Sequence, residues 1–489
     1  MKKVFRRFLL PFVYGTIVAL PLLMPVQLCA PAYAAEAEAE CWAVIVGISD
    51  YENYDDLTYC DDDAEELASQ LGAIWGVDHI KLLTDSMATK QAIENAMTDW
   101  LASREEANDV VLFFWAGYRY MGYLLPHDSL TTSYNNDISA SKLDNWLDAL
   151  DSGKIVVMNI GSEEFFDALS GTGRIILTYS GLGEDYWFTS DLGHGVFAYY
   201  VLEALREFEA ADNDGDFELS VEEVFDYAAT RTTSYTASDP DLTTQHPQIS
   251  DNYGGQLSLL TKVTADVGPD LPQDISLLNI DGKMYSPAEL PVSFIWAPGS
   301  GHDFKAVSSV SGGNGIQYVF DSWDDGNTSD SRTISHGGTY TANYTTHYYL
   351  TVESDYGQPE GEGWYSVGSM ATISVASSEG AIIRQVFIGW SGDCSATTAS
   401  ASVIMDVPRT VVANWRTDYM QLYLIIGGGV IVVGALVVVL MMRRRRKAVA
   451  PARVERVPQP PITKYCKNCG AEIKPGDAFC TKCGEAVEE

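Results

Sequence analysis

Four cysteines near the C-terminus have the spacing of a metal site. Cys466 and Cys469 form one Cys-x-x-Cys pair, and after ten further residues Cys480 and Cys483 form a second pair. Four thiolates at this spacing can close a tetrahedral shell around Zn²⁺, which then supplies the folding free energy that so short a segment lacks. A closed shell leaves no position for a substrate, so we predict a structural zinc. The alternative is four unligated thiols.

An acidic segment over residues 212–223 is a second candidate metal site. Its carboxylates occupy the first, third, fifth, seventh and twelfth positions of an EF-type Ca²⁺ loop. These residues are Asp212, Asp214, Asp216, Glu218 and Glu223. The sixth position carries Phe217 instead of the glycine that makes the sharp turn, with Gly215 nearby as a source of flexibility. The alternative is an acidic helix start capped by Ser220.

Two apolar segments end in loops where reactive groups are expected, yet neither loop carries a catalytic pair. Residues 110–119 and 154–163 are each predicted to form a buried strand followed by a loop, with Tyr118 in the first loop and Gly161 in the second. A tyrosine with a pKa of about 10 is a poor base at neutral pH. A glycine has no side chain that could attack a substrate.

The elements that must position these loops alternate along residues 41–262. Strands are expected over residues 41–48 and 79–84, from Val110 and from Ile155, and over 175–178; helices are expected over 61–71, 91–101 and 196–208. This alternation predicts an α/β domain with βαβ units, in which a mainly parallel sheet is covered by helices on both faces. Reactive groups of such sheets lie at the carboxyl ends of the strands, where Tyr118 and Gly161 fall.

Several separated blocks in this region resemble the caspase-like cysteine peptidases in their order and spacing. The blocks are residues 42–51, 61–64, 123–128, 195–200 and 245–255. The resemblance implies a caspase-like domain over residues 41–262. The related legumain-like peptidases share this architecture and remain an alternative.

The resemblance also implies a catalytic pair that this chain lacks. In the family a histidine in a Ser-Gly-His-Gly setting after the third strand works with a cysteine in an Asp-x-Cys-x-Ser-Gly setting after the fourth. The matching positions here are Tyr118 and Gly161, and Asn159 replaces the preceding acid. Their separation is close to the roughly 50 residues typical of caspases, which supports the alignment.

We therefore expect a peptidase homologue without activity, which keeps a groove for a peptide or protein ligand. Ser162 is a weak replacement nucleophile, with His127 or His194 as its base, because a shift of one residue changes the direction of the side chain. For Cys41 and Cys60 we expect structural roles. The alternative function is an active membrane-anchored endopeptidase of the caspase or legumain type with a relocated nucleophile.

Residues 270–417 differ in kind, since Thr, Ser, Tyr, Val and Gly replace the helical pattern. A segment around Trp323 and Asn343 recurs around Trp390 and Asn414, which predicts tandem β-rich repeat modules. The modules resemble the β repeats of bacterial and archaeal surface proteins. Exposed aromatic residues of such modules bind carbohydrate, but hairpin packing explains the tryptophans as well, and we favour a stalk or spacer.

Two apolar segments predict the placement of the chain in a membrane. Residues 1–34 have the basic start, apolar centre and small-x-small end of a signal peptide, although an uncleaved anchor is the alternative. Residues 422–442 carry no charge and would span about 30 Å as a helix, the thickness of a bilayer core. The linker over residues 443–463 begins with a basic cluster and contains prolines, which predicts a cytoplasmic side for residues 464–486. The expected protein therefore crosses the cell membrane once, with its N-terminal part outside.

The net charge and the cysteine content of the chain limit the kinds of partner that it is expected to bind. The net charge of −36 argues against nucleic acid, since phosphate binding needs a basic surface. Residues 464–486 resemble the small zinc ribbons and have nearly balanced charge, which favours a cytoplasmic protein partner. A disulfide between Cys41 and Cys60 is possible on the outer side, and the sequence alone leaves it open.

Overall fold

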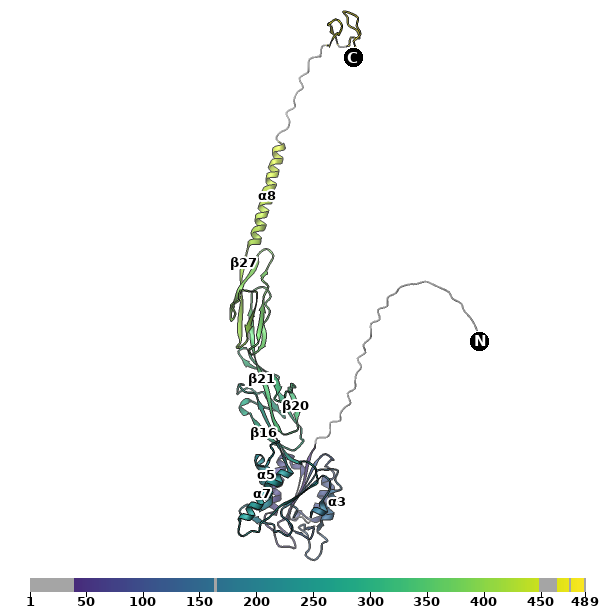
Figure 1. Cartoon of the computed structure of the whole chain (residues 1–489), viewed down its shortest axis with the longest axis vertical. Helices are drawn as coiled ribbons and strands as arrows, with labels where there is room; N and C mark the ends of the chain where they lie inside the picture. The colour runs from purple at the N-terminus through teal and green to yellow at the C-terminus, as the bar shows by residue number, and fades with distance from the viewer. Residues whose placement is uncertain (1–38, 162–164, 448–463, 475, 488–489) are drawn as a thin grey trace, which may run out of the picture. The chain divides into compact units, whose positions relative to one another are not determined.

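The computed structural model describes residues 39–161, 165–447, 464–474 and 476–487 (Figure 1). The predicted signal peptide, Ser162 and most of the predicted linker lie outside the described residues. The chain divides into two compact units. The first unit comprises the chain up to Tyr349 together with two short later segments, Trp364–Ser369 and Met405–Pro408. The second unit comprises the remainder.

The first unit contains a six-stranded sheet with the strand order β12-β8-β7-β3-β1-β2. The strands are β1 (Cys41–Gly47), β2 (Ile80–Thr84), β3 (Val110–Ala116), β7 (Ile155–Met158), β8 (Arg174–Thr178) and β12 (Gln248–Asp251). Five of these strands, β1, β2, β3, β7 and β8, pair in parallel, and β12 pairs antiparallel with β8 at the edge. The mainly parallel sheet was predicted from the sequence, whereas the antiparallel edge strand was not.

Helices cover both faces of this sheet because its central strands alternate between two hydrophobic clusters. In β3, Leu112 and Phe114 pack into one cluster, while Phe113 and Trp115 pack into the other. The first face carries α1 (Cys60–Trp75), α5 (Val196–Arg206), α6 (Phe208–Ala211) and α7 (Val221–Ser238), and the second carries α2 (Lys90–Asn95), the π-helical turn η3 (Ala96–Leu101), α3 (Ala140–Leu147) and α4 (Phe166–Leu169). Figure 1 shows α5 and α7 on one side of the sheet and α3 on the other.

Short elements complete this part of the chain. They are the 3₁₀ turns η1 (Val77–His79) and η2 (Asp85–Met87), and the strands β4 (Arg119–Tyr120), β5 (Tyr123–Leu124), β6 (Ile138–Ser139), β9 (Phe188–Thr189), β10 (His194–Gly195) and β11 (Glu218–Ser220). The long strand β13 (Ser258–Val267) pairs with β11 at one end and continues into the β-rich part of the first unit. The predicted end of the α/β domain at residue 262 therefore falls within a continuous strand.

The β-rich part of the first unit packs around one further hydrophobic cluster. Its elements are β14 (Leu278–Ile280), β15 (Lys283–Tyr285), η5 (Pro287–Glu289), β16 (Val292–Trp296), β17 (His302–Ala306), β18 (Ser309–Gly313), β19 (Ile316–Trp323), β20 (Ser331–Ile334), the first part of β21 (Gly338–Glu353) and β22 (Gly363–Ser366). Trp323 is 1% exposed, and its indole N–H donates to the carbonyl of Ser329 at 2.8 Å.

The second unit begins with the end of β21, which pairs in parallel with β27. Its other elements are β23 (Met370–Ser374), β24 (Ser378–Glu379), β25 (Arg384–Gly392), β26 (Ser400–Ile404) and β27 (Arg409–Asp418). Trp390 is 4% exposed, and its indole N–H donates to the carbonyl of Thr398 at 3.1 Å. Packing into the core therefore explains this tryptophan, as it explains Trp323, while the role of the region as a stalk stays a prediction.

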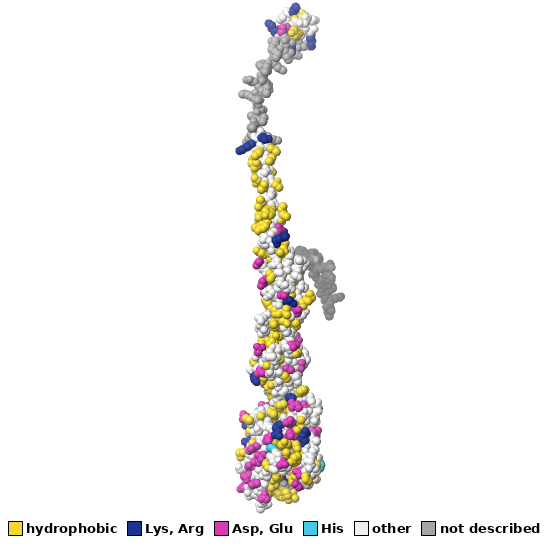
Figure 2. All heavy atoms as spheres, turned by 90° about the vertical axis from the view of Figure 1, so that its left-hand side faces the viewer, with side chains coloured by type: hydrophobic (Ala, Val, Ile, Leu, Met, Phe, Trp, Pro, Cys, Tyr) yellow, Lys and Arg dark blue, Asp and Glu magenta, His cyan; other side chains and the backbone are white. Residues whose placement is uncertain are grey.

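The helix α8 (Met420–Lys447) follows β27 and carries exposed apolar side chains along its length (Figure 2). Among the described residues it is the one helix long and apolar enough to cross a membrane, over Met420–Arg445, and this range includes the predicted span. The described residues of the C-terminal part, 464–474 and 476–487, include two short strands, β28 (Lys464–Tyr465) and β29 (Glu472–Ile473).

Candidate functional site

Tyr118 stands just beyond the carboxyl end of β3, in the position predicted for a catalytic base. Its backbone N–H donates to the Tyr51 hydroxyl at 2.8 Å, and its ring packs against Tyr51 and Tyr54 with centroids 5.0 and 5.8 Å away. Burial and the charge of Asp55 raise the pKa of Tyr118 above its ordinary value. The hydroxyl therefore stays protonated at neutral pH and cannot serve as a base.

Gly161 follows the neighbouring strand β7 and lies at the same edge of the sheet, because β3 and β7 pair in parallel. The loop is fixed by Asn159, which is buried, adopts φ 61° and donates from its side-chain amide to the Trp115 carbonyl at 3.0 Å. Gly161 itself has φ 112°, a conformation that side chains rarely adopt, and its carbonyl accepts from the Tyr179 N–H at 3.2 Å.

The side chain of Arg119 fills the space where a nucleophile at position 161 would stand. A Cβ atom built on Gly161 would lie 2.5 Å from Cδ and 2.8 Å from Nε of Arg119, closer than unbonded atoms approach. Arg119 is held there by Tyr179, because its Nε donates to the tyrosine hydroxyl at 2.6 Å and its guanidinium lies 5.4 Å from the ring centroid. No role for Arg119 was predicted from the sequence, although this residue directly follows Tyr118.

Among the other groups named as replacements, the two cysteines lie in settings that oppose catalysis. Ser162 is outside the described residues. Cys41 and Cys60 are separate thiols, each 1% exposed, and burial raises the pKa of both well above the ordinary value of a thiol. His127 lies with its Nδ1 atom 2.6 Å from the carbonyl of Asp50. The structure therefore contains no disulfide between Cys41 and Cys60, and neither thiol is a ready nucleophile.

His194, the second histidine considered, belongs to a buried polar cluster that the sequence did not reveal. Its Nδ1 lies 2.8 Å from Asp63 and its Nε2 lies 3.0 Å from Glu66, so both ring nitrogens contact carboxylates on α1. Asp63 is fully buried and also accepts from the Tyr186 hydroxyl at 3.2 Å and from the Gly195 N–H at 3.2 Å. Burial raises the pKa of Asp63 to about 6, and the hydrogen bond to Asp63 raises the pKa of His194.

The acidic segment brings three of its five predicted ligands together. Carboxylate oxygens of Asp212, Asp214 and Asp216 all lie within 4.8 Å of one another. Phe217 takes the left-handed conformation of the glycine it replaces, with φ 71°, and its N–H donates to Asp212 at 3.3 Å. Phe217 at the sixth position therefore does not prevent the sharp turn of the loop.

The remaining two predicted ligands accept hydrogen bonds from other groups of the protein. Glu223 accepts from the Asn213 N–H at 2.8 Å and forms a capping box with Ser220 at the start of α7. Glu218 accepts from the Thr261 hydroxyl at 2.6 Å and from the Gly337 N–H at 2.9 Å. The helix-capping alternative for Ser220 is confirmed, and calcium binding stays a prediction.

The four C-terminal cysteines converge as their spacing predicts. The Sγ atoms of Cys466 and Cys483 are 3.8 Å apart, those of Cys469 and Cys480 are 3.6 Å apart, and all four lie within 4.8 Å of one another. A tetrahedral zinc with Zn–S bonds of about 2.3 Å requires sulfur atoms about 3.8 Å apart, whereas a disulfide requires about 2.05 Å. The four thiols therefore fit a bound zinc and not two disulfides.

Two matched turns position these cysteines. Gly470 N–H donates to the Cys466 carbonyl at 2.9 Å, and Gly484 N–H donates to the Cys480 carbonyl at 2.8 Å. Both glycines have positive φ, 70° and 78°, which explains why a glycine follows each cysteine pair.

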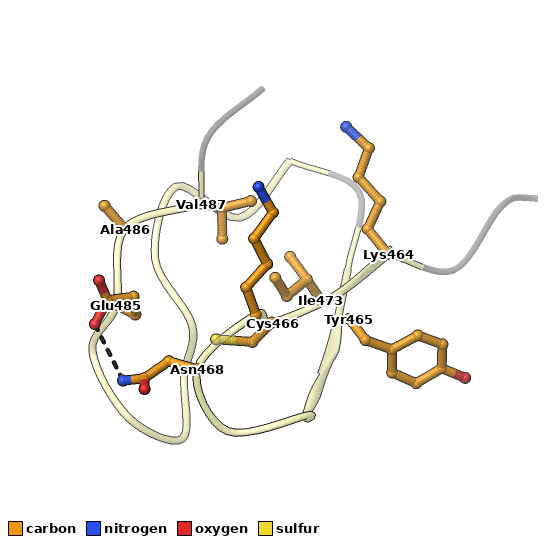
Figure 3. Close-up of a pocket in the computed structure, with 9 residues that line it drawn as sticks. Lys464, Tyr465, Cys466, Asn468, Ile473, Glu485, Ala486 and Val487 are labelled. Atoms are coloured by element: carbon orange, nitrogen blue, oxygen red, sulfur yellow. Dashed lines mark hydrogen bonds between the residues drawn. The ribbon is translucent and has the colours of Figure 1, made fainter.

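A pocket of about 760 Å³ lies beside the cysteines (Figure 3). Lys464, Tyr465 and Val487 are among the residues that line it, and Asn468 donates to Glu485 at 3.2 Å across one side. Apolar and charged side chains line the pocket, and the pocket is open to solvent.

Comparison with protein families identifies two domains in this chain. Residues 40–251 match the family model of the caspase domain, and residues 465–487 match that of the zinc-ribbon domain. The chain therefore contains a caspase domain and a C-terminal zinc-ribbon domain, which confirms both resemblances and the predicted fold. No curated protein matches the chain.

Proposed function

We propose that this chain is a membrane-anchored surface protein whose caspase domain binds a peptide or protein without cutting it. The observation that carries the proposal is the side chain of Arg119, which fills the place of a nucleophile at Gly161 while Tyr118 stands in place of the base. A cysteine peptidase needs a thiolate, a nearby base and donors for the oxyanion. The described residues at these two loops provide neither the thiolate nor the base.

The rest of the domain supports a retained binding role. Helices cover both faces of the sheet, and in the loops after β3 and β7 the Tyr118 N–H donates to the Tyr51 hydroxyl and the Asn159 amide donates to the Trp115 carbonyl. Loops at the carboxyl ends of parallel strands are common ligand-binding places in α/β domains. Arg119 and the half-buried ring of Tyr118 offer such a ligand a cationic and an aromatic contact.

The helix α8 and its flanking residues support the proposed membrane topology. The apolar helix is followed by Arg443, Arg444 and Arg445, and basic residues stay on the cytoplasmic side of a membrane. The caspase domain then lies outside the cell and the zinc ribbon in the cytoplasm. The reducing cytoplasm keeps cysteine thiols free for zinc, which is consistent with this orientation.

In the zinc ribbon, Cys466, Cys469, Cys480 and Cys483 would hold a structural Zn²⁺. Its positive charge would stabilise the four thiolates and fix the two turns that carry them. The role that remains for so small a domain is contact with a protein, and the pocket beside Tyr465 is a surface suited to it. The ribbon would thereby link a ligand bound outside to a partner inside.

Peptide hydrolysis is the decisive test of the inactive caspase domain. The full-length chain in nanodiscs is incubated with a panel of fluorogenic peptides bearing acidic, basic or apolar residues before the cleaved bond, with Ca²⁺ or with EGTA. We expect no turnover above the buffer blank under either condition. Turnover that disappears on changing Ser162, Cys41 or Cys60 would overturn the proposal and establish the alternative, an endopeptidase with a relocated nucleophile.

Ligand binding needs its own test. Selection of phage-displayed random peptides on the same nanodiscs should enrich a common motif, and Arg119→Ala should abolish that enrichment. Lys283→Ala, an exposed change on β15, is the matched control and should leave the enrichment unchanged. Failure to enrich any motif on the unmodified chain would contradict the binding role.

A further inference from the structure

The turn between β24 and β25 exposes two adjacent isoleucines. Ile382 is 48% exposed and Ile383 is 49% exposed, although residues in turns of soluble surfaces are usually small or polar. The turn is tight, because a Cβ atom on Gly380 would lie 2.3 Å from the Ile383 carbonyl oxygen. Its residues 380–383 contain no charge.

The register of the sheet places this turn beside the start of α8. The strands β25 and β27 pair antiparallel, with Arg384 opposite Asp418, the last residue of β27. The turn precedes Arg384 and therefore extends beyond the level of Asp418, in the direction in which the chain continues toward Met420, where α8 begins. At about 3.3 Å per residue, Ile383 and Ile382 lie about 3 and 7 Å beyond the level of Asp418, and α8 begins two residues beyond the same level.

The side chains around the turn form a boundary between polar and apolar surface. Tyr419 and Met420 are 45% and 61% exposed on the chain that enters α8. Just below, the guanidinium of Arg384 donates to the Ser378 hydroxyl at 2.5 Å, and Glu379 accepts from the Gly357 N–H at 2.6 Å, so these charges are held against the module. Tyrosine at the edge of an apolar span is typical of the headgroup level of a membrane.

We propose that the turn of residues 380–383 inserts into the outer leaflet of the membrane that α8 spans. The inference rests on the proposed membrane span, and lipid is the occupant because the turn is tied through the β25–β27 register to the point where the chain enters the bilayer. Ile382 and Ile383 then enter the headgroup and acyl boundary, as apolar faces of interfacial segments do. The turn is a second point of contact besides α8, and two contacts restrict how the module can tilt on the membrane.

Photoreactive lipid tests this placement on the full chain. The protein is reconstituted in nanodiscs containing a phospholipid with a diazirine near the glycerol backbone, irradiated, digested and mapped by mass spectrometry. We expect lipid adducts on α8 and on the turn of residues 380–383. The matched control is Ile388, which is similarly exposed at 51% on the adjoining strand β25 but about 16 Å further from the helix start than Ile383, and it should carry none.

A double variant sharpens the readout. Ile382→Ser with Ile383→Ser should reduce adducts on the turn about tenfold, because it removes two half-exposed apolar side chains from the lipid, and adducts on α8 should stay unchanged. Adducts on α8 without adducts on the turn of the unmodified chain would overturn this inference alone. Absence of adducts on α8 would instead overturn the proposed membrane span.

Discussion

Substitution of Gly161 by alanine should destabilise the caspase domain by more than its backbone conformation alone explains. The positive φ of 112° costs an alanine about 1–2 kcal/mol. The new Cβ would also lie 2.5 Å from Cδ of Arg119, so this side chain must move and lose its hydrogen bond to Tyr179. A hydrogen bond from a charged donor contributes about 1–3 kcal/mol, which gives an expected total loss of about 2–5 kcal/mol.

Gly183→Ala isolates the backbone cost. Gly183 has φ 78°, and a Cβ atom there would meet nothing within 4 Å. This control should therefore lose only about 1–2 kcal/mol. Arg119→Ala isolates the contact with Arg119 in a second way. In a chain that already carries Arg119→Ala, Gly161→Ala should lower the free energy of unfolding by no more than Gly183→Ala does. The coupling between positions 119 and 161 should thus be about 1–3 kcal/mol.

Denaturation by urea followed through tryptophan fluorescence measures these free energies in the full chain. All eleven tryptophans lie between Trp42 and Trp415, so the signal excludes α8 and the zinc ribbon. Trp115 is buried in β3 and its carbonyl bonds the Asn159 side chain, which makes it a local probe of the two loops. Equal losses for Gly161→Ala and Gly183→Ala, with no coupling to position 119, would refute the conclusion that Arg119 fills the nucleophile's space.

Three further predictions test the other sites. Cys480→Ser or a strong chelator should remove zinc, which inductively coupled plasma mass spectrometry measures. The unfolding transition seen by tryptophan fluorescence should stay unchanged, and retained zinc would contradict the four-thiolate site. The pKa of His194 is raised, so the stability that protonation of His194 contributes is present at low pH and should be lost as the pH rises above the ordinary pKa of a histidine. His194→Gln should flatten this dependence in urea titrations, and an unchanged slope would contradict it. Calcium should raise the melting temperature at millimolar concentrations and not do so in Asp214→Ala, and a null result with the unmodified chain in isothermal titration calorimetry would dismiss that site.

The sheet was predictable because its strands are short runs of apolar residues that end in recognisable loops. β1, β3 and β7 are buried on both faces, and burial on both faces produces uninterrupted apolar sequence. The edge strand β12 lacks this signal, since three of its four residues are only partly buried and the fourth is exposed. The helix predicted over residues 91–101 is divided into α2 and the π-helical turn η3, a change of hydrogen bonding that apolar periodicity does not reveal.

The cysteine site was predictable for a different reason, because its four ligands are close in sequence and their spacing encodes the geometry. The Asp63–His194 cluster joins residues 131 positions apart, and its existence depends on the packing of α1 against β10. The role of Arg119 likewise depends on the distance between two loops, which the sequence of either loop does not contain. Phe217 was expected to distort the acidic loop, yet it adopts φ 71°, because a backbone hydrogen bond from Phe217 to Asp212 and contact with Gly337 hold it there.

Loss of catalytic side chains can leave two different structures behind. An open space beside Gly161 would leave a domain in which a single cysteine substitution restores the nucleophile at little cost. Here Arg119 occupies that space and is hydrogen-bonded to Tyr179, so a cysteine at position 161 meets the same contact as an alanine. Restoring a thiol therefore requires the loss of a stabilising interaction as well as a new base at Tyr118. The structure at Gly161 is therefore a site occupied by an arginine and not an empty peptidase site, which supports the proposed binding role.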